Sequence, residues 1–172
     1  AIAQQGLLRG KKMLIIDRAP KLDNDRTWCF WERGAGSLDE VVHHSWPSIT
    51  VADQKSKMHI DLGDYRYKMV RSASFYAQLN KELTQHPEIE FKFEAITEIK
   101  EGPSTALLIT AEGQYRSPLI MNSALRSMHY EQQEKYPVLA QHFIGWFVKT
   151  AQPIFDPERA DFMDFSIAQK GN

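Results

Sequence analysis

The sequence predicts an α/β protein, and three observations support this prediction. Residues 12–17 form a short apolar run that ends in an acid, a pattern typical of a strand in a parallel sheet. Phe75, Leu79 and Leu83 repeat every four residues, which is the spacing of one helix face. Residues 89–122 contain short alternating runs typical of antiparallel strands. We therefore expect a parallel unit into which a mainly antiparallel sheet is inserted.

Composition limits the functional classes that this chain of 172 residues can belong to. Its 42% hydrophobic and 25% charged content is that of a globular protein. A net charge of −1 without a basic run argues against a nucleic-acid partner. The single cysteine, Cys29, excludes an internal disulfide and an all-cysteine metal site. There is no secretory signal, and no apolar run approaches the roughly 20 residues of a membrane span. Membrane contact would therefore be peripheral and the location cytoplasmic.

The first 18 residues read as the tail of a helix, a glycine C-cap and a strand that ends at Asp17. The second strand of a Rossmann-like dinucleotide-binding unit has this form, and its terminal acid accepts hydrogen bonds from a ribose hydroxyl. Asp17 and the adjacent Arg18 are thus candidate cofactor-binding residues. The glycine fingerprint about 20 residues before that acid would fall before Ala1. The alternative is an ordinary α/β strand with an acid at its exit.

Residues 19–46 are expected to form a loop, because Pro20, Gly34 and Gly36 interrupt them. The loop carries three aromatic side chains, Trp28, Phe30 and Trp31. They either pack on themselves above the sheet or form the wall of a ligand site. His43 and His44 are rejected as a metal pair, because adjacent residues on a strand point to opposite faces.

Short strands are expected at residues 49–51, 57–61 and 65–70, the first two joined by a polar turn at 53–56. A helix capped by Ser72 or Ser74 follows and ends at His86-Pro87. Arg71 lies at the junction between strand and helix. A surface ion pair is the plain interpretation of this arginine.

Residues 89–122 are expected to form a small sheet, which turns at Glu112-Gly113 and returns through residues 119–121. The small residues that follow this last strand let a backbone approach a ligand closely. Asn122 stands at this point, either beside a ligand or simply at a strand end. Residues 128–141 are polar and connect this sheet to the next segment.

Residues 142–165 predict two apolar strands, 143–150 and 162–167. They are joined by a turn whose backbone is restricted by proline residues. Asp164 lies between Met163 and Phe165 on the second strand. An acid in an apolar frame invites a raised pKa and proton chemistry. Strand alternation alone would instead place Asp164 on the wet face.

Three motifs resemble those of the lycopene cyclase family. The last segment reads G-W-x-x-x-T-x-x-P-x-F-D-P-x-x-x-x-x-M-D-F, from Gly145 to Phe165. The stretch N-x-x-T-W at Asn24–Trp28 is similar to the N-terminal signature of the bacterial members. The third, Y-x-Y-x-x-x-R-x-x-x-F-Y, runs from Tyr65 to Tyr76. Because the motifs follow in order over most of the chain, the chain resembles an internal fragment of such a cyclase, without its glycine fingerprint and its C-terminal part.

The resemblance implies a truncated FAD/NAD(P)-binding, Rossmann-like flavoprotein fold, with residues 1–141 as a partial FAD-binding domain and 142–172 as the start of a substrate domain. It implies redox-neutral cyclisation of the ends of lycopene, or a related linear carotene, to β-ionone rings. Reduced FAD is the implied cofactor, with NAD(P)H as a possible reductant. Asp164 would then be catalytic, Asp17, Arg18, Arg71 and Asn122 cofactor-binding, and Trp28 and Trp146 substrate-binding.

Two alternatives from other classes stay open. One is a flavin-dependent monooxygenase or a prenyl-chain reductase built on the same framework. The other is an inactive fragment that binds nothing, because the glycine fingerprint and a downstream glutamate-containing motif of the family would lie outside these residues.

Overall fold

The structure, a computed structural model, describes residues 6, 8, 10–123 and 144–167. The chain divides into two compact units, Ala1–Phe93 with Pro153–Asn172 (unit 1) and Glu94–Gln152 (unit 2). This division by packing is separate from the functional domains 1–141 and 142–172, which stay a prediction. The α/β fold class is confirmed, because unit 1 combines a parallel strand pair, a helix and two further sheets, whereas unit 2 contains an antiparallel sheet.

The parallel pair of unit 1 joins β1 (Met13–Asp17) to β7 (Ile89–Phe93), with Met13 opposite Ile89 and Asp17 opposite Phe93. The strand predicted to end at Asp17 is therefore confirmed. Just before it, Gly10 has a φ of 78°, the left-handed conformation that a glycine C-cap requires. The helix predicted to precede Gly10 lies largely outside the described residues.

A second sheet of unit 1 has the order β2-β6-β3 and is antiparallel throughout. Its strands are β2 (Thr27–Arg33), β6 (Tyr65–Arg71) and β3 (Val42–Trp46), and the short 3-10 helix η1 (Asp39–Val41) precedes β3. The prediction of a loop over residues 19–46 is wrong for β2 and β3. Aromatic and β-branched residues give both strands high β propensity, and β6, the partner of both, comes more than 20 residues later.

The third sheet of unit 1 has the order β11-β4-β5. It contains β4 (Ser48–Ala52), β5 (Lys57–Asp61) and β11 (Arg159–Asp164), with β11 parallel to β4. The predicted strands 49–51 and 57–61 are confirmed. The Asp53 carboxylate accepts backbone hydrogen bonds from Lys55 and Ser56, both 2.7 Å long, and so forms the predicted polar turn between them.

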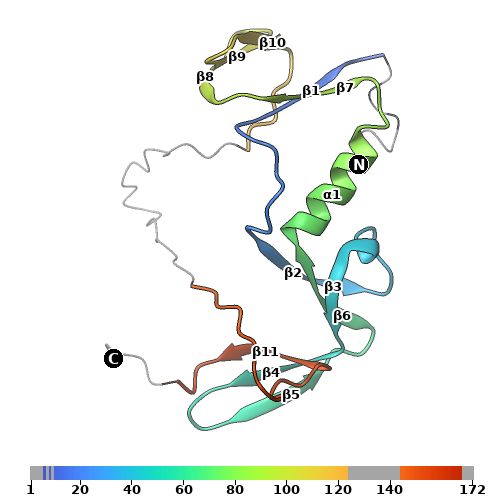
Figure 1. Cartoon of the computed structure of the whole chain (residues 1–172), viewed down its shortest axis with the longest axis vertical. Coiled ribbons are helices and arrows are strands. Elements are labelled where there is room, and N and C mark those ends of the chain that lie inside the picture. Colours follow the sequence, from blue (N-terminus) through green and yellow to red (C-terminus); the bar gives the residue numbers. More distant parts are fainter. Residues whose placement is uncertain (1–5, 7, 9, 124–143, 168–172) are drawn as a thin grey trace. The chain divides into compact units, whose positions relative to one another are not determined.

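Helix α1 (Ser72–Leu83) follows β6 without a break, as Figure 1 shows. Its N-cap residue is Arg71 in extended geometry, so the prediction that Ser72 or Ser74 caps the helix is wrong. Thr84 closes the C-terminal end before the predicted stop at His86-Pro87. The apolar face formed by Phe75, Leu79 and Leu83 is partly buried, as its spacing predicts.

Unit 2 contains the sheet β10-β9-β8, made of β8 (Ile96–Lys100), β9 (Ala106–Thr110) and β10 (Gln114–Ser117). The small antiparallel sheet is therefore present, but β7 does not belong to it. Residues 119–121 do not form the expected returning strand. Residues 144–150 are not in a strand either, and the side chains of Ile144, Trp146, Phe147 and Val148 are 60–88% exposed.

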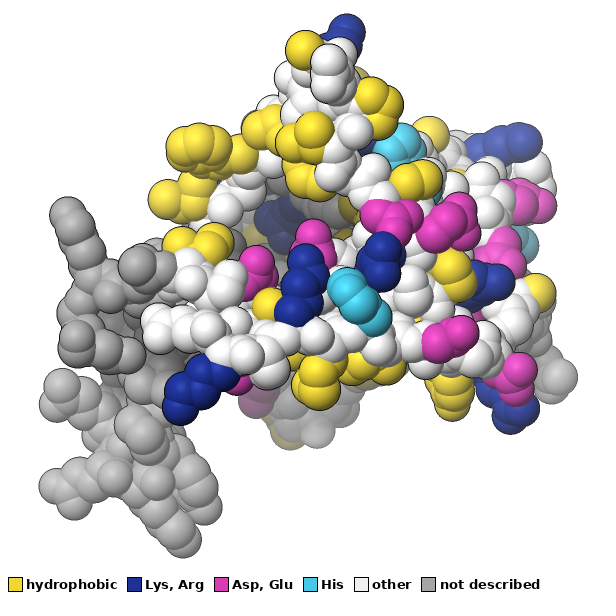
Figure 2. Space-filling model, turned by 90° about the horizontal axis from the view of Figure 1, so that it is seen from below, with side chains coloured by type: hydrophobic (Ala, Val, Ile, Leu, Met, Phe, Trp, Pro, Cys, Tyr) yellow, Lys and Arg dark blue, Asp and Glu magenta, His cyan; other side chains and the backbone are white. Residues whose placement is uncertain are grey.

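Few hydrophobic side chains in the described part of the chain are buried. The buried set is Leu8, Ile49, Ala52, Val70 and Leu108. On the face drawn in Figure 2, acidic and basic side chains are interleaved, with hydrophobic ones between and around them. No helix among the described residues is long and apolar enough to cross a membrane.

Candidate functional site

One face of the β2-β6-β3 sheet carries a row of three aromatic side chains. Trp31 on β2 and Trp46 on β3 both lie opposite Tyr67 on β6. The ring centroids of Trp31 and Tyr67 are 4.5 Å apart, and those of Trp46 and Tyr67 are 5.8 Å apart. Directly opposed residues share a sheet face, so the register alone places the three rings side by side. Contacts of this length are favourable aromatic pairs.

Phe162 of β11 packs edge-on against this row from the neighbouring sheet. Its ring centroid lies 5.3 Å from that of Trp31 and 5.4 Å from that of Tyr67. The register of β11 shifts between Asp161 and Met163, so Phe162 is the extra residue of a bulge. Trp31 nevertheless stays 44% exposed, which leaves part of the aromatic row open.

Burial raises the pKa of Tyr67 to about 12, and a hydrogen bond with the Cys29 thiol acts in the same direction. The Tyr67 phenol therefore keeps its proton at any physiological pH. The row presents neutral, electron-rich rings, and such rings attract a cation placed over their faces.

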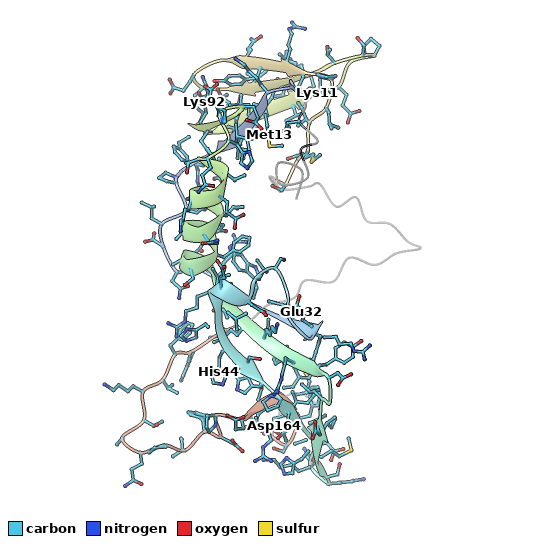
Figure 3. The ribbon with its side chains drawn as sticks, turned by 90° about the vertical axis from the view of Figure 1, so that its right-hand side faces the viewer. Lys11, Met13, Glu32, His44, Lys92 and Asp164 are labelled. Atoms are coloured by element: carbon cyan, nitrogen blue, oxygen red, sulfur yellow. The ribbon has the colours of Figure 1, made fainter. Side chains whose placement is uncertain are left out.

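His44 extends the aromatic row on β3. Its ring centroid lies 4.6 Å from that of Trp46, and its Nε2 lies 2.7 Å from the carbonyl oxygen of Pro157. The register of β3 shifts between Val42 and His44, which brings His44 opposite Met69 on the face of the aromatic row. Figure 3 shows His44 and Asp164 in the same part of unit 1.

Arg71 ends β6 on the same face as the aromatic row, since it is four residues beyond Tyr67 on one strand. That separation is about 13 Å along the strand. The Nε of Arg71 is buried and has no hydrogen-bond partner within the described residues. A buried, unpaired donor of this kind is uncommon and costly unless a ligand or water satisfies it. The Nε of Arg71 is thus available to a ligand, and the contact of Arg71 with a cofactor stays a prediction.

His43 is exposed, and its pKa is lowered first by partial desolvation and then by the positive charges of Arg71 and His44. Among the described residues, no group of three or more His, Cys, Asp or Glu side chains is placed to hold a metal ion.

Ser72 fastens the N-x-x-T-W motif to the start of α1. Its hydroxyl accepts a hydrogen bond from the backbone N–H of Arg26 at 3.0 Å and donates to the carbonyl of Asp23 at 3.2 Å. Ser72 is fully buried. Trp28 then packs edge-on against Phe75 and Tyr76 of the helix, with centroid distances of 5.4 and 5.8 Å. Three residues before Trp31, Trp28 lies on the opposite sheet face, so the structure does not bring it together with the aromatic row.

Lys68 forms a buried ion cluster on the same sheet face as Trp28. Its Nζ lies 2.5 Å from a carboxylate oxygen of Asp39, 2.8 Å from one of Glu32 and 3.1 Å from the carbonyl of Gly34. The Lys68 side chain is only 6% exposed. Hydrogen bonding to Asp39 and Glu32 raises the pKa of Lys68, and the bond from Lys68 lowers that of Asp39. The cluster fixes the segment between β2 and β3 against the sheet that carries the aromatic row.

Asp164 lies at the end of β11 and is exposed. Its carboxylate accepts hydrogen bonds from the hydroxyl and the backbone N–H of Ser166, at 2.5 and 2.9 Å. These bonds lower the pKa of Asp164, so the expectation of a raised pKa is wrong. At this exposed strand end the hydrogen bonds from Ser166 stabilise the charged carboxylate, whereas burial would have favoured the neutral acid.

The remaining predicted site residues are Asp17, Arg18, Asn122 and Trp146. Asp17, at the carboxyl end of β1, forms a half-exposed ion pair with Lys21 at 3.4 Å, and Arg18 beside it is exposed. Asn122 and Trp146 belong to unit 2, where both are exposed. Their roles, like those of Asp164, Arg71 and Trp28, stay predictions.

The family model of the lycopene cyclase protein matches residues 1–172. The chain belongs to the lycopene cyclase family. The match extends from end to end, so it includes both sheets of the aromatic site and all three motifs that suggested the family. No curated protein matches the chain.

Three solved structures are similar to part of this lycopene cyclase family member. They are FqzB (11% identity, TM-score 0.46, 63% of this chain and 29% of that one), the flavin-dependent brominase Bmp2 (14%, 0.41, 63% and 30%) and 2,6-dihydroxypyridine-3-hydroxylase from Arthrobacter nicotinovorans (10%, 0.38, 59% and 28%). The chain spans less than a third of the length of each. The activity and ligands of the whole protein are therefore proposals.

The sequence did not reveal that His44, Trp46 and Phe162 contribute to one site. From the sequence, the histidine pair suggests only metal binding, and Phe162 suggests only the start of a strand. One signal was available: His44 and Trp46 are two residues apart, which is the same-face spacing of a strand.

Proposed function

We propose that the protein cyclises the linear ends of lycopene, or a related carotene, to β-ionone rings without net oxidation or reduction. The observation that carries the proposal is one sheet face that holds a row of aromatic rings and, about 13 Å along the strand, a buried unpaired arginine donor. Family membership supports it. The first feature suits a carbocation and the second an anionic cofactor.

The chemistry asks for three things from the chain. A proton must reach the terminal double bond, the cation that forms must be held while the neighbouring alkene closes the ring, and a proton must then leave. Trp31, Tyr67 and Trp46 would hold the cation over their π faces and exclude water from it. Asp164, charged at neutral pH, would contribute as a carboxylate that stabilises positive charge.

The chain offers residues that fit FAD. Arg71 supplies the buried, unpaired donor that a phosphate or flavin oxygen would satisfy, and Asp17 stands at the end of a parallel strand where a ribose hydroxyl is bound in dinucleotide folds. Arg18 and Asn122 are further candidates for this role. When bound and reduced, the flavin would supply electrostatic or acid–base assistance, with NAD(P)H as the reductant.

Linear carotenes dissolve in lipid, so the proposal includes peripheral contact with a membrane on its cytoplasmic side.

The decisive experiment expresses the complete reading frame in a bacterium that accumulates lycopene and separates the pigments. The proposal expects cyclised carotene of unchanged mass. Unchanged lycopene beside soluble, flavin-loaded protein would contradict it, and a product with added oxygen or hydrogen would favour a monooxygenase or a reductase. Mixing the 172-residue chain with FAD separately tests whether this segment alone shifts the flavin spectrum.

A further inference from the structure

Of the two ring nitrogens of His44, one makes a hydrogen bond within the described residues and the other does not. A backbone carbonyl can only accept hydrogen bonds, so the contact of 2.7 Å with Pro157 requires that Nε2 carries the proton. In the neutral ring Nδ1 then holds a lone pair. Within the described part of the chain, Nδ1 makes no hydrogen bond.

Three other polar groups of the two sheets are poorly suited to accept a proton. The Tyr67 phenol is already protonated, and the Cys29 thiol is hydrogen-bonded to it. Asp164 is a weak base, because the hydrogen bonds from Ser166 stabilise its charged form. The His44 ring lies against Trp46 with the two planes inclined by 50°, and the bulge in β3 places His44 on the face of the row. β-Bulges re-aim side chains in this manner next to active sites.

We propose that His44, through Nδ1, accepts the proton that the cyclised cation loses. The inference rests on the proposed function. The alkene π pair closes the ring and leaves the positive charge on the adjacent ring carbon that bears a methyl group. His44 removes the hydrogen from the carbon at the new ring junction, and that C–H pair becomes the ring double bond. One proton enters and one leaves, so no redox partner is needed.

The choice of hydrogen decides which ring forms. Loss from the junction carbon gives the β ring, whereas loss from the neighbouring ring CH₂ or from the methyl group gives other ring isomers. A fixed base beside the row therefore acts on product identity as well as on rate. A histidine that only held residues 153–158 against β3 would affect all products alike.

The test compares His44→Gln with the wild type in the complete protein. The glutamine Nε2 can still donate to the Pro157 carbonyl, but an amide does not accept a proton as imidazole does. We expect flavin content close to that of the wild type, a loss of β-ring product of about a hundredfold and a larger share of the other ring isomers. His86→Gln, at a histidine beyond the end of α1, is the matched control and should change neither quantity.

Chemical rescue provides the second measurement. In His44→Ala, added imidazole should restore β-ring formation, whereas His86→Ala should not respond. If the ring-isomer ratio of His44→Gln equals that of the wild type and imidazole restores nothing, the role of His44 as a base is overturned. If the wild type does not cyclise lycopene, the proposed function itself fails, and this inference fails with it.

Discussion

Ser72 shows how one hydroxyl can join stretches that are far apart in the chain. It accepts from Arg26 and donates to Asp23, which precede it by 46 and 49 residues. Its own backbone N–H also donates to the Arg26 carbonyl at 2.9 Å. The motif that ends in Trp28 is therefore held in two ways. Ser72 binds its backbone, and α1 packs against the Trp28 ring. Such a hydroxyl fixes a segment more than it adds to the core.

Replacing Ser72 by alanine should destabilise the protein by about 1 kcal/mol, because the part-buried hydrogen bond from the Arg26 N–H to the Ser72 hydroxyl would be lost. Denaturant unfolding measures the change in free energy. Ser74→Ala, on the exposed side of the same helix, is the control and should stay within about 0.5 kcal/mol of the wild type. Equal stability of the two variants would show that the Ser72 bonds contribute nothing.

The environment of Asp164 favours its charged carboxylate over the neutral acid. If its carboxylate stabilises the cation, Asp164→Asn should lower carotene cyclisation by about a hundredfold without changing the flavin content. The pigment ratio in lycopene-accumulating cells measures this. Asp161→Asn, at an exposed acid earlier on β11, should behave as the wild type does. Full activity in Asp164→Asn would remove Asp164 from the catalytic residues.

At the scale of elements, the Lys68 cluster links β6, β2 and η1. Lys68→Met would leave Glu32 and Asp39 without their cation. We expect a loss below the roughly 3–5 kcal/mol of a fully buried pair, because both acids keep access to water. Thermal and urea unfolding measure it, with Lys81→Met, exposed on α1, as the control.

The pH dependence of this loss follows from the two pKa shifts. The pKa of Asp39 is lowered in the folded protein, so its stabilising effect is present above its ordinary value of 3.8 and is lost as the pH falls through the folded value. The pKa of Lys68 is raised, so its effect is present below 10.5 and is lost as the pH rises through the folded value. The stability difference between wild type and Lys68→Met should thus be flat between these limits and shrink below about pH 4. A difference that stays constant into acid would contradict the ion cluster.

Elements whose signal is local were predicted well. β1, β4, β5, β9 and α1 follow from apolar runs, alternation and helical spacing in the sequence itself. β2 and β3 were missed because glycines and a proline around them mimic a loop, and only pairing with the later β6 reveals them as strands. Residues 144–150 show the reverse case, since aromatic β propensity without a paired strand did not suffice.

The residues of the candidate site also differ in whether the sequence alone could place them. Arg71 could be placed at a strand–helix junction from sequence, because that junction is a local feature. The aromatic row could not, because it depends on the register that sets Trp31, Tyr67 and Trp46 opposite one another. Phe162 reaches the aromatic row only through a bulge in β11, about 90 residues further along the chain. No sequence periodicity predicts such a bulge.

At the scale of the whole molecule, three features of the lycopene cyclase family member meet on β6. This strand carries Tyr67 of the aromatic row, Lys68 of the ion cluster and Arg71 at its end, and it leads directly into α1. A single strand thereby links the proposed carotene surface to the proposed cofactor contact. Cofactor binding and cyclisation should consequently be separable by mutation along β6.

Arg71→Met tests this separation. Its guanidinium would make charge-assisted hydrogen bonds, which contribute about 1.5–3 kcal/mol each, so its loss should weaken FAD binding by about 10–100-fold. Flavin fluorescence titration of the complete protein measures the dissociation constant. Arg66→Met, at an exposed arginine on the same strand, should bind FAD as the wild type does. Because Tyr67 keeps its place in the row, saturating FAD should restore cyclisation in Arg71→Met. Unchanged affinity would mean that the buried Nε serves another partner, and Arg71 would then leave the cofactor site.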